Sequence, residues 1–504
     1  MILFSAFFFL SSVFWMRSVI HPIGWALAEG LGALLLARLV LRKESLSIPR
    51  SDFLIPFLLL VLWTAVSLFW TQNFYATVMS FYKIVFLLIL IVAFMNEREL
   101  WKKSFRTAIL FTGLAASLVL VFLYPWTARW MNDGNLYGAV LAQAGIIALD
   151  EAMSSEKQWK GAGLLIWIAL ALALLGSLGP ILGLLGGGSL LIRTRARSTA
   201  MDRRAPRIFG GAVFLILIIS LIPRSWKIFP FPDLWGRHFQ ETYAFERIQI
   251  GKDSLRYLRG HALLGSGLGS FRDVYPQYKT IAELRNASHA HDEPLTLLCE
   301  LGLFGLFFFL WFIFYLRHLR KKFPDFWQDS LPWGAGLAAS LVQAIFDFNL
   351  RYLPLLILAV FWISIILPER ELRPDQRRRL ALSMGIGLWS VLTLLPGAAY
   401  ALFLKGNHAR WASRLDPLNG FFRSETGRMR DLEIAIDLEP RNVWYRRRAA
   451  QFYWEDWKRT GNEASRTQAL KEAQAAADLA PNVAQFQAEL DRLREEILKG
   501  KSPG

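Results

Sequence analysis

Long apolar runs separated by short polar loops dominate this chain of 504 residues. Each run extends over roughly 18–22 residues, the length that a helix needs to cross a lipid bilayer. Backbone amides inside lipid must find their hydrogen bonds within their own segment, so these runs predict helices. They are too long and continuous for the strands of a membrane barrel, which alternate over roughly ten residues. The pattern therefore predicts an all-α, polytopic integral membrane protein with about 12–13 transmembrane helices.

The boundaries of the runs predict thirteen spans. The segment 161–192 is too long for one span, and Gly176, Gly179 and Pro180 are expected to break it into two helices. The second of these helices is short and rich in glycine, which favours close packing on a neighbour. Residues 1–16 lack the charged leader and cleavage site of a signal peptide, so we interpret them as a retained helix. The expected spans are residues 2–16, 22–41, 53–70, 75–95, 107–126, 136–150, 161–177, 179–192, 208–222, 295–316, 331–347, 352–367 and 381–404.

Basic residues fall on one side of this topology. The chain is 54% hydrophobic and carries a formal net charge of +17. Arginine and lysine cluster in alternate loops, whereas the short loops between them hold only isolated basic residues such as Arg17, Arg129 and Arg351. The positive-inside rule places the clustered loops in the cytoplasm, which explains the charge without nucleic acid as a partner. The clusters begin at Arg42, Arg98, Arg193, Arg317 and Arg370.

The same rule places the N-terminus in the cytoplasm. Two large polar segments then lie outside: residues 223–294, called the outer loop, and residues 405–504, called the tail. The expected division is N-terminal transmembrane helices (1–222), the outer loop (223–294), C-terminal transmembrane helices (295–404) and the non-cytoplasmic tail (405–504).

The tail is charged, has a helical pattern and repeats a short phrase. Residues 412–419 read Ala-Ser-Arg-Leu-Asp-Pro-Leu-Asn, residues 435–442 read Ala-Ile-Asp-Leu-Glu-Pro-Arg-Asn, and residues 476–482 read Ala-Ala-Asp-Leu-Ala-Pro-Asn. A helix ending in Ala-x-x-Leu, with Pro-x-Asn or Pro-Asn before the next helix, resembles tetratricopeptide repeats. The steps between the prolines depart from the usual period of roughly 34 residues, and a plain array of helical hairpins is the alternative. Either structure suits binding a protein partner or bracing the outer loop.

Candidate metal ligands are few. Cys299 is the only cysteine, which excludes an intramolecular disulfide and a cysteine zinc site. His289 and His291 precede Asp292, but the hydrolase pattern His-x-His-x-Asp-His is absent. No metal and no cofactor are therefore expected.

Functional residues are expected where water meets the membrane-embedded helices, and the outer loop is the segment at this position. Residues 288–295 read Ser-His-Ala-His-Asp-Glu-Pro-Leu, and the next span begins with Leu-Gly-Leu-Phe-Gly at 301–305. Upstream lie Arg247 and, at 261–271, His-Ala-Leu-Leu-Gly-Ser-Gly-Leu-Gly-Ser-Phe. The blocks follow the order Arg, Gly-x-Gly-x-Gly, His, Gly-x-x-Gly.

These ordered blocks, the helix count and the outer position of the loop resemble the O-antigen ligase and O-antigen polymerase (Wzy_C-type) family. The matched stretch is roughly 237–316. The resemblance implies transfer of a glycan from an undecaprenyl-diphosphate carrier to an acceptor, which is lipid A core, a growing polysaccharide or a protein hydroxyl. Ligase, polymerase and protein oligosaccharyltransferase remain open. The rival is a non-catalytic membrane scaffold or assembly factor for polysaccharide export, with the repeats as its working surface.

By this resemblance His291 and Arg247 are the catalytic residues. His291 would act as general base toward the acceptor hydroxyl or handle the proton for the leaving diphosphate, since an imidazole titrates near neutrality. His289 is the alternative base. Arg247 would bind the diphosphate, because a guanidinium offers a permanent charge and a bidentate fork.

Further residues are expected to contact the substrate. The glycines let the backbone approach the sugar or diphosphate, or they form a tight turn. The expected substrate-binding residues are Arg237, Gly265, Gly267, Gly269, His289 and Asp292.

The chain departs from the family at one membrane position. The family commonly carries Ser-Arg-Gly in a span before the outer loop, and the aligned stretch here is Ser177-Leu178-Gly179. Leu178 therefore replaces an arginine that faces the carrier diphosphate, and Arg237 or Lys279 is the expected substitute. Glu300, near the outer end of a span, is a further candidate, and Asp347 and Arg351 flank an outer turn where they are placed to pair.

Overall fold

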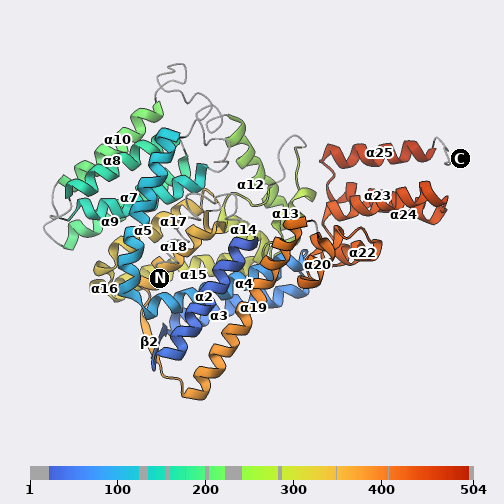
Figure 1. The fold of residues 1–504 in the computed structure, drawn as a ribbon. Coiled ribbons are helices and arrows are strands. Elements are labelled where there is room, and N and C mark those ends of the chain that lie inside the picture. Colours follow the sequence, from blue (N-terminus) through green and yellow to red (C-terminus); the bar gives the residue numbers. More distant parts are fainter. Residues whose placement is uncertain are drawn as a thin grey trace.

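The structure is a computed structural model, and it describes residues 22–123, 134–154, 158–175, 177–198, 204–221, 241–281, 287–347, 349–406 and 408–498. Among these residues almost all regular structure is helical, apart from two short strands. Figure 1 shows a helical bundle from which the C-terminal helices project to one side. The expected span 2–16 and Arg237 lie outside the described residues.

Long apolar helices form the bundle and confirm an all-α, polytopic membrane protein. Seven of the described helices are long and apolar enough to cross a membrane: α2 (Pro22–Arg42), α3 with η2 (Ser51–Val66 and Ser67–Phe69), α4 (Phe74–Asn96), α5 with the π-turn η3 (Arg98–Leu118 and Val119–Leu123), α8 (Gln158–Leu175), α15 (Leu303–Lys322) and α19 (Gln376–Gly406). The other bundle helices are α7 (Gly134–Ala152), α9 (Leu178–Ser198), α10 (Arg204–Leu221), α16 (Pro324–Asp329), α17 (Leu331–Ala344) and α18 (Leu353–Ile366).

The number of spans stays a prediction. Helices α17 and α18 have only 14 residues each, which is short for a bilayer crossing. Helix α9 carries arginines at its C-terminal end, which interrupt its apolar stretch. Such helices can still lie at membrane depth when neighbouring helices surround them.

The expected break within 161–192 is confirmed. Helix α8 ends at Leu175 and α9 begins at Leu178. The glycines of α9 pack against α17: a Cβ built on Gly187 would lie 2.5 Å from the backbone oxygen of Ala335. Small residues at a helix interface allow this close backbone approach in membranes.

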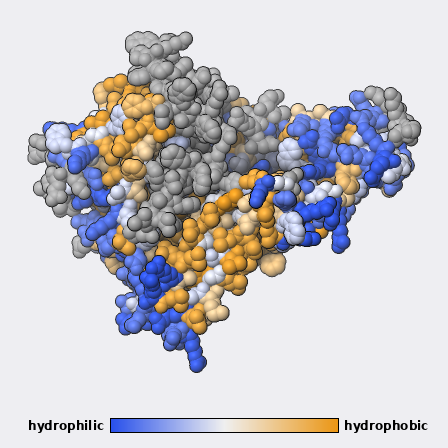
Figure 2. Space-filling view, in the orientation of Figure 1, coloured by the Kyte–Doolittle hydropathy of each residue, from blue (hydrophilic) through white to orange (hydrophobic). Residues whose placement is uncertain are grey.

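A two-stranded antiparallel pair joins distant parts of the bundle. Strand β1 (Leu46–Pro49), after α2, pairs with β2 (Glu369–Leu372), after α18, with Leu46 opposite Leu372. The loops that begin at Arg42 and Arg370 therefore lie on the same side of the membrane, as their basic charge predicts. Figure 2 shows an apolar band over α2 and α19 between a hydrophilic tip at the start of α19 and the hydrophilic tail.

The outer loop is helical and has its own small core. It contains α12 (Glu241–His261), α13 (Phe271–Val274), η4 (Tyr275–Gln277) and the start of α14 (Glu293–Leu301). Tyr257, Phe271 and Tyr275 stack in series and are fully buried. Aromatic stacking of this kind fixes the elements that precede α14.

The tail consists of paired helices whose ends follow the repeated phrase. Asn419 and Asn442 accept hydrogen bonds from the first backbone amides of the next helices, as N-cap residues do. The helices are α20 (Ala409–Leu415), α21 (Gly420–Ser424), α22 (Met429–Leu438), α23 (Val443–Thr460), α24 (Glu463–Leu479) and α25 (Ala484–Leu498). The helical hairpins are thus observed, whereas a tetratricopeptide assignment stays a prediction.

All three repeated turns of the tail contact the rest of the chain. We call residues 416–419, 439–442 and 480–482 the repeat turns. Each donates or accepts a hydrogen bond with the start of α4 or with the outer loop, so the tail and the outer loop lie on the same side of the membrane. The bonds are Tyr75 Oη to Asp416 Oδ2 at 2.8 Å, Asn73 Nδ2 to Glu439 Oε2 at 3.3 Å, and Asn482 Nδ2 to the backbone oxygen of Lys279 at 2.6 Å.

Candidate active site

His291 has an unusual backbone conformation at the entrance to α14. Its φ of 56° makes it the non-glycine residue with positive φ among the described residues. A residue other than glycine rarely adopts this region, and the strain of roughly 1–3 kcal/mol persists only where the surroundings impose it. Here Thr296 imposes it, because its hydroxyl donates to the backbone oxygen of Asp292 at 2.7 Å and accepts from the Ala290 amide at 3.2 Å.

Asp292 is the N-cap of α14. Its Oδ1 accepts a hydrogen bond from the Leu295 amide at 2.9 Å. Burial raises the pKa of this carboxyl, and the bond from Leu295 partly offsets the effect. A role for Asp292 in substrate binding stays a prediction, and its contacts indicate that it orients the residue before it.

The imidazole of His291 faces the turn that joins α17 to α18. Its Nδ1 lies 3.6 Å from Oδ1 of Asp347, whose side chain is only 2% exposed, whereas the imidazole is 26% exposed. A buried carboxylate beside one ring nitrogen can hold the imidazole in one orientation. Asp347 thus faces Nδ1 and not Nε2, the second ring nitrogen.

Arg247 reaches the same turn from α12. Its Nη1 donates to the backbone oxygen of Phe346 at 3.1 Å. Phe346 precedes Asp347, so the two residues that the sequence singled out as catalytic meet at adjacent positions of one turn. They are 44 residues apart in the chain and come from different elements.

Arg351, at the end of this turn in η5 (Asn349–Arg351), anchors it to α14. Its guanidinium lies 3.2 Å from Oε2 of Glu293 and 3.1 Å from Oε2 of Glu300. Both glutamates are almost fully buried. Breaking such a buried pair costs roughly 3–5 kcal/mol. The network therefore fixes the His291 and Asp347 segments relative to each other.

His289 is held neutral. Burial lowers its pKa well below the ordinary value, and the charges of Arg351 and His291 lower it further. A neutral imidazole two residues from His291 can accept or donate a hydrogen bond but adds no charge to the site.

The glycines at 265, 267 and 269 all have positive φ, between 71° and 100°. A Cβ on Gly265 would lie 2.2 Å from the backbone oxygen of Glu300, and one on Gly267 would lie 2.1 Å from Thr71 Oγ1. The loop therefore packs its own backbone between α14 and the start of α4, which is the tight-turn alternative. Contact of these glycines, Gly269 included, with substrate stays a prediction.

The proposed substitutes for the missing arginine lie apart from this turn or outside the described residues. Leu178, 57% exposed, begins α9. A Cβ on its neighbour Gly179 would lie 4.0 Å from Phe346 Cβ, so position 178 lies beside the turn that Arg247 and His291 share. Lys279 is buried beneath the tail, where its backbone oxygen accepts from Asn482. Arg237 is not described.

Comparison with known families bears on this site. Residues 163–310 match the family model described as Wzy_C, O-antigen ligase. The family implies glycan transfer in polysaccharide assembly. No curated protein matches the chain.

The matched stretch contains Leu178, Arg247 and His291 but ends before Asp347 and Arg351. These last two residues were not assigned to the site from the sequence. Their signal was their charge between two apolar helices, which was interpreted as a mutual pair. In the structure Arg351 pairs with Glu293 and Glu300, and Asp347 faces His291.

Clusters of metal-ligating side chains were also considered. Within the part of the chain that the structure describes, no three His, Cys, Asp or Glu side chains gather closely enough to hold a metal ion. Cys299 is buried in the core of the outer loop.

Proposed function

We propose that this protein transfers a glycan from an undecaprenyl-diphosphate carrier to an acceptor hydroxyl, with His291 as the proton-handling group and without a metal ion. The convergence of His291 and Arg247 on the α17–α18 turn supports this proposal most strongly. The O-antigen ligase match supports the reaction class.

In the proposed reaction His291 acts as general base. Nε2 takes the proton of the acceptor hydroxyl while the hydroxyl oxygen attacks the anomeric carbon of the carrier-linked sugar. The bond from that carbon to the diphosphate oxygen breaks, and the electron pair leaves with the diphosphate. Asp347, 3.6 Å from Nδ1, stabilises the imidazolium that forms.

Arg247 binds the leaving diphosphate in this mechanism. One of its guanidinium nitrogens already donates to the Phe346 carbonyl, which holds the group in place. The remaining N–H groups can donate to two phosphate oxygens, a geometry that lysine lacks. Near a membrane the diphosphate is poorly solvated, so a fixed positive charge there matters more than in water.

The proposed site lies at the periplasmic face of a bacterial inner membrane. The basic loops joined by β1 and β2 are assigned to the cytoplasm by the positive-inside rule. The outer loop and the tail then lie in the periplasm, where a carrier-linked glycan meets its acceptor. Reporter fusions at Lys279 and Gly504 should both indicate export.

A matched pair of histidine variants tests the mechanism. His291→Ala should lower the transfer rate by roughly 10²–10⁴-fold, because the general base is lost. His289→Ala, two residues away and neutral, should retain most of the activity. Transfer is measured with purified protein and lipid-linked glycan. Full activity of a correctly inserted His291→Ala protein would contradict the proposed role of His291 as general base.

The rival is a non-catalytic assembly factor, which Leu178 favours because the membrane arginine is absent. The carrier-linked glycan pool in a deletion strain distinguishes the two functions. If the deletion strain still accumulates this glycan when it expresses the His291→Ala protein, the result supports catalysis. Complementation to wild-type levels supports a scaffold.

A further inference from the structure

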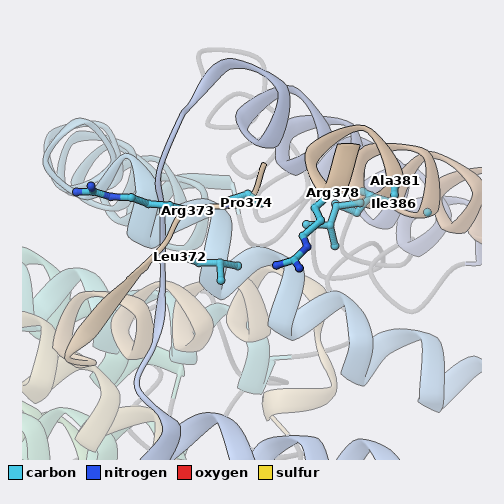
Figure 3. Close-up of a pocket in the computed structure, with 8 residues that line it drawn as sticks. Leu372, Arg373, Pro374, Arg378, Ala381 and Ile386 are labelled. Atoms are coloured by element: carbon cyan, nitrogen blue, oxygen red, sulfur yellow. The ribbon is translucent and has the colours of Figure 1, made fainter. Parts of the chain in front are cut away.

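A groove lies far from His291, between the end of β2 and the first turns of α19. Its volume is about 570 Å³, and Leu372, Arg378, Leu382, Gly385 and Ile386 are among the residues that line it. Figure 3 shows the Arg378 side chain reaching across the groove toward Leu372. The groove thus has an apolar floor and a cationic rim.

The groove lies at the membrane end opposite to the candidate active site. Helix α18 runs from the α17–α18 turn to β2 over 14 residues, which at roughly 1.5 Å per residue span about 21 Å. Helix α19 then returns across the bundle to the tail. A ligand in the groove therefore does not compete with the proposed transfer site.

The rim carries arginines whose ion pairs in the structure are weak. Arg378 lies 3.6 Å from Asp375 and Arg373 lies 2.9 Å from Glu371, and all four side chains are more than half exposed. Exposed ion pairs contribute little, so either guanidinium can turn to another anion. Nε of Arg379 is buried and has no hydrogen-bond partner among the described residues.

The floor continues along the lipid-facing side of α19. Leu382, Met384 and Leu388 are exposed by 43%, 67% and 63%. A Cβ added to Gly385 would have nothing within 4 Å, so this glycine leaves open space in the groove. An apolar channel that begins at a basic rim at the bilayer surface fits a phosphate group with an attached acyl chain.

We propose that this groove binds an anionic glycerophospholipid, with its phosphate at Arg378 and one acyl chain against Leu382, Gly385 and Ile386. Charge complementarity selects the anionic headgroup over a zwitterionic one. The site anchors the start of α19 and does not depend on the proposed glycan transfer.

Native mass spectrometry of the full-length protein in detergent tests the proposal, with phosphatidylglycerol and phosphatidylcholine as probes. Wild-type protein should retain phosphatidylglycerol preferentially. Arg378→Gln should weaken phosphatidylglycerol binding roughly fivefold, the equivalent of one interfacial arginine, and abolish the preference. Arg317→Gln, a change of equal charge at the end of α15, is the matched control.

A second pair of variants tests the acyl-chain position. Gly385→Leu should fill the groove and weaken binding of both lipids, without steric conflict in the fold. Gly387→Leu is equally unobstructed but does not line the groove, so it should bind like wild type. Equal retention of phosphatidylglycerol by all variants would overturn the proposal. Retention of undecaprenyl diphosphate in preference to phosphatidylglycerol would assign the groove to the carrier instead.

Discussion

The turn that joins α17 to α18 lies beside both Arg247 and the start of α9, where Leu178 stands. Arg247 is a cation, whereas Leu178 is apolar. Arg247 donates to the Phe346 carbonyl, while Gly179, next to Leu178, packs against the side chain of Phe346. If the diphosphate binds at this turn, Arg247 carries charge that two arginines share in the family pattern. The Leu178 side chain is exposed, so this position has room for a longer side chain.

An arginine at position 178 should therefore restore the missing charge. Arg247→Ala should raise the KM for carrier-linked glycan and lower kcat, and Arg247→Lys should still impair transfer because the fork is lost. Adding Leu178→Arg to Arg247→Ala should recover roughly tenfold in kcat/KM, a typical contribution of one charge-assisted hydrogen bond. Steady-state kinetics measure this. If the double variant inserts normally but shows no recovery of kcat/KM, a side chain at position 178 does not reach the diphosphate.

At the scale of single residues, the sequence singled out candidate residues but not the partners that they have in the structure. His291 and Arg247 were singled out because they stand in ordered blocks. Asp347 was not, because nothing local relates a carboxylate after α17 to a histidine before α14. The positive φ of His291 was also unpredictable, since it arises from the hydrogen bonds that Thr296 makes on both sides.

Among the elements, the glycine-rich loop determines how closely α14 approaches α4. The amides of Ser266 and Gly267 donate to the backbone oxygens of Cys299 and Glu300, and the Gln72 amide donates to Ser266. The last turn of α14 thus finds partners for carbonyls that a helix leaves open at its C-terminus. Side chains at the glycines would separate these segments.

Replacing Gly267 should loosen this element. Gly267→Ala adds a Cβ 2.1 Å from Thr71 Oγ1 at a φ of 100°, which should cost roughly 2–5 kcal/mol from backbone strain and overpacking. Gly427→Ala, at a φ of 73° with nothing within 4 Å, is the control for strain alone. Hydrogen exchange of residues 262–281 should accelerate only in the first variant. Unchanged hydrogen exchange would show that the Thr71 side chain moves aside without a cost in free energy.

At the scale of elements, the sequence predicted helix ends well where it contains a capping residue or a helix-breaking residue. The asparagines of the repeated phrase start helices, and α8 ends at Leu175 before α9 begins at Leu178, with Gly179 and Pro180 in its first turn. Between the two interpretations of the glycine-rich loop, the sequence could not choose. The atoms that exclude a side chain there belong to Thr71 and Glu300, which are distant in sequence.

For the whole molecule, the tail is part of the framework of the outer loop. Asn73 lies at the centre of the contact: its Nδ2 donates to Asp273 at 2.6 Å and to Glu439 at 3.3 Å, while its Oδ1 caps α4. The two carboxyl groups come from the outer loop and the tail. The pKa of Glu439 is raised to about 7, mainly by burial and in smaller part by the charge of Asp273.

Docking of the tail should therefore weaken as the pH rises. A carboxyl with a raised pKa in the docked state stabilises that state fully below its ordinary pKa of 4.5, and the contribution disappears as the pH passes about 7. The groups that face Glu439 are Asn73, Asp273, Arg272, Asn442 and Tyr445.

Hydrogen exchange of the repeat turn 439–442 measures this dependence. Exchange, corrected for its intrinsic pH dependence, should increase between pH 5 and pH 8 in the wild type, and Glu439→Gln should remove most of the increase. Glu455→Gln, on α23 outside this contact, is the control. A pH response that persists in Glu439→Gln would assign it to another group, with Asp273 as the next candidate.

The charge pattern predicted which loops share a side, and β1 with β2 and the repeat turns with the outer loop agree with it. Docking of the tail onto α4 was not predictable. Asp416 and Glu439 resemble ordinary helix-end acids, and their partners Tyr75 and Asn73 precede them by more than 340 residues.

The packing of α2 has a consequence for biogenesis. Its main neighbour is α19, where Ser390 Oγ donates to the Gly30 carbonyl and Leu394 covers Gly30, and β1, which follows it, pairs with β2. Both partners leave the ribosome more than 300 residues after α2. The face of α2 that packs on α19 must therefore wait in the bilayer, exposed to lipid or to a membrane chaperone. Chains released before α19 should be the preferred targets of membrane proteases.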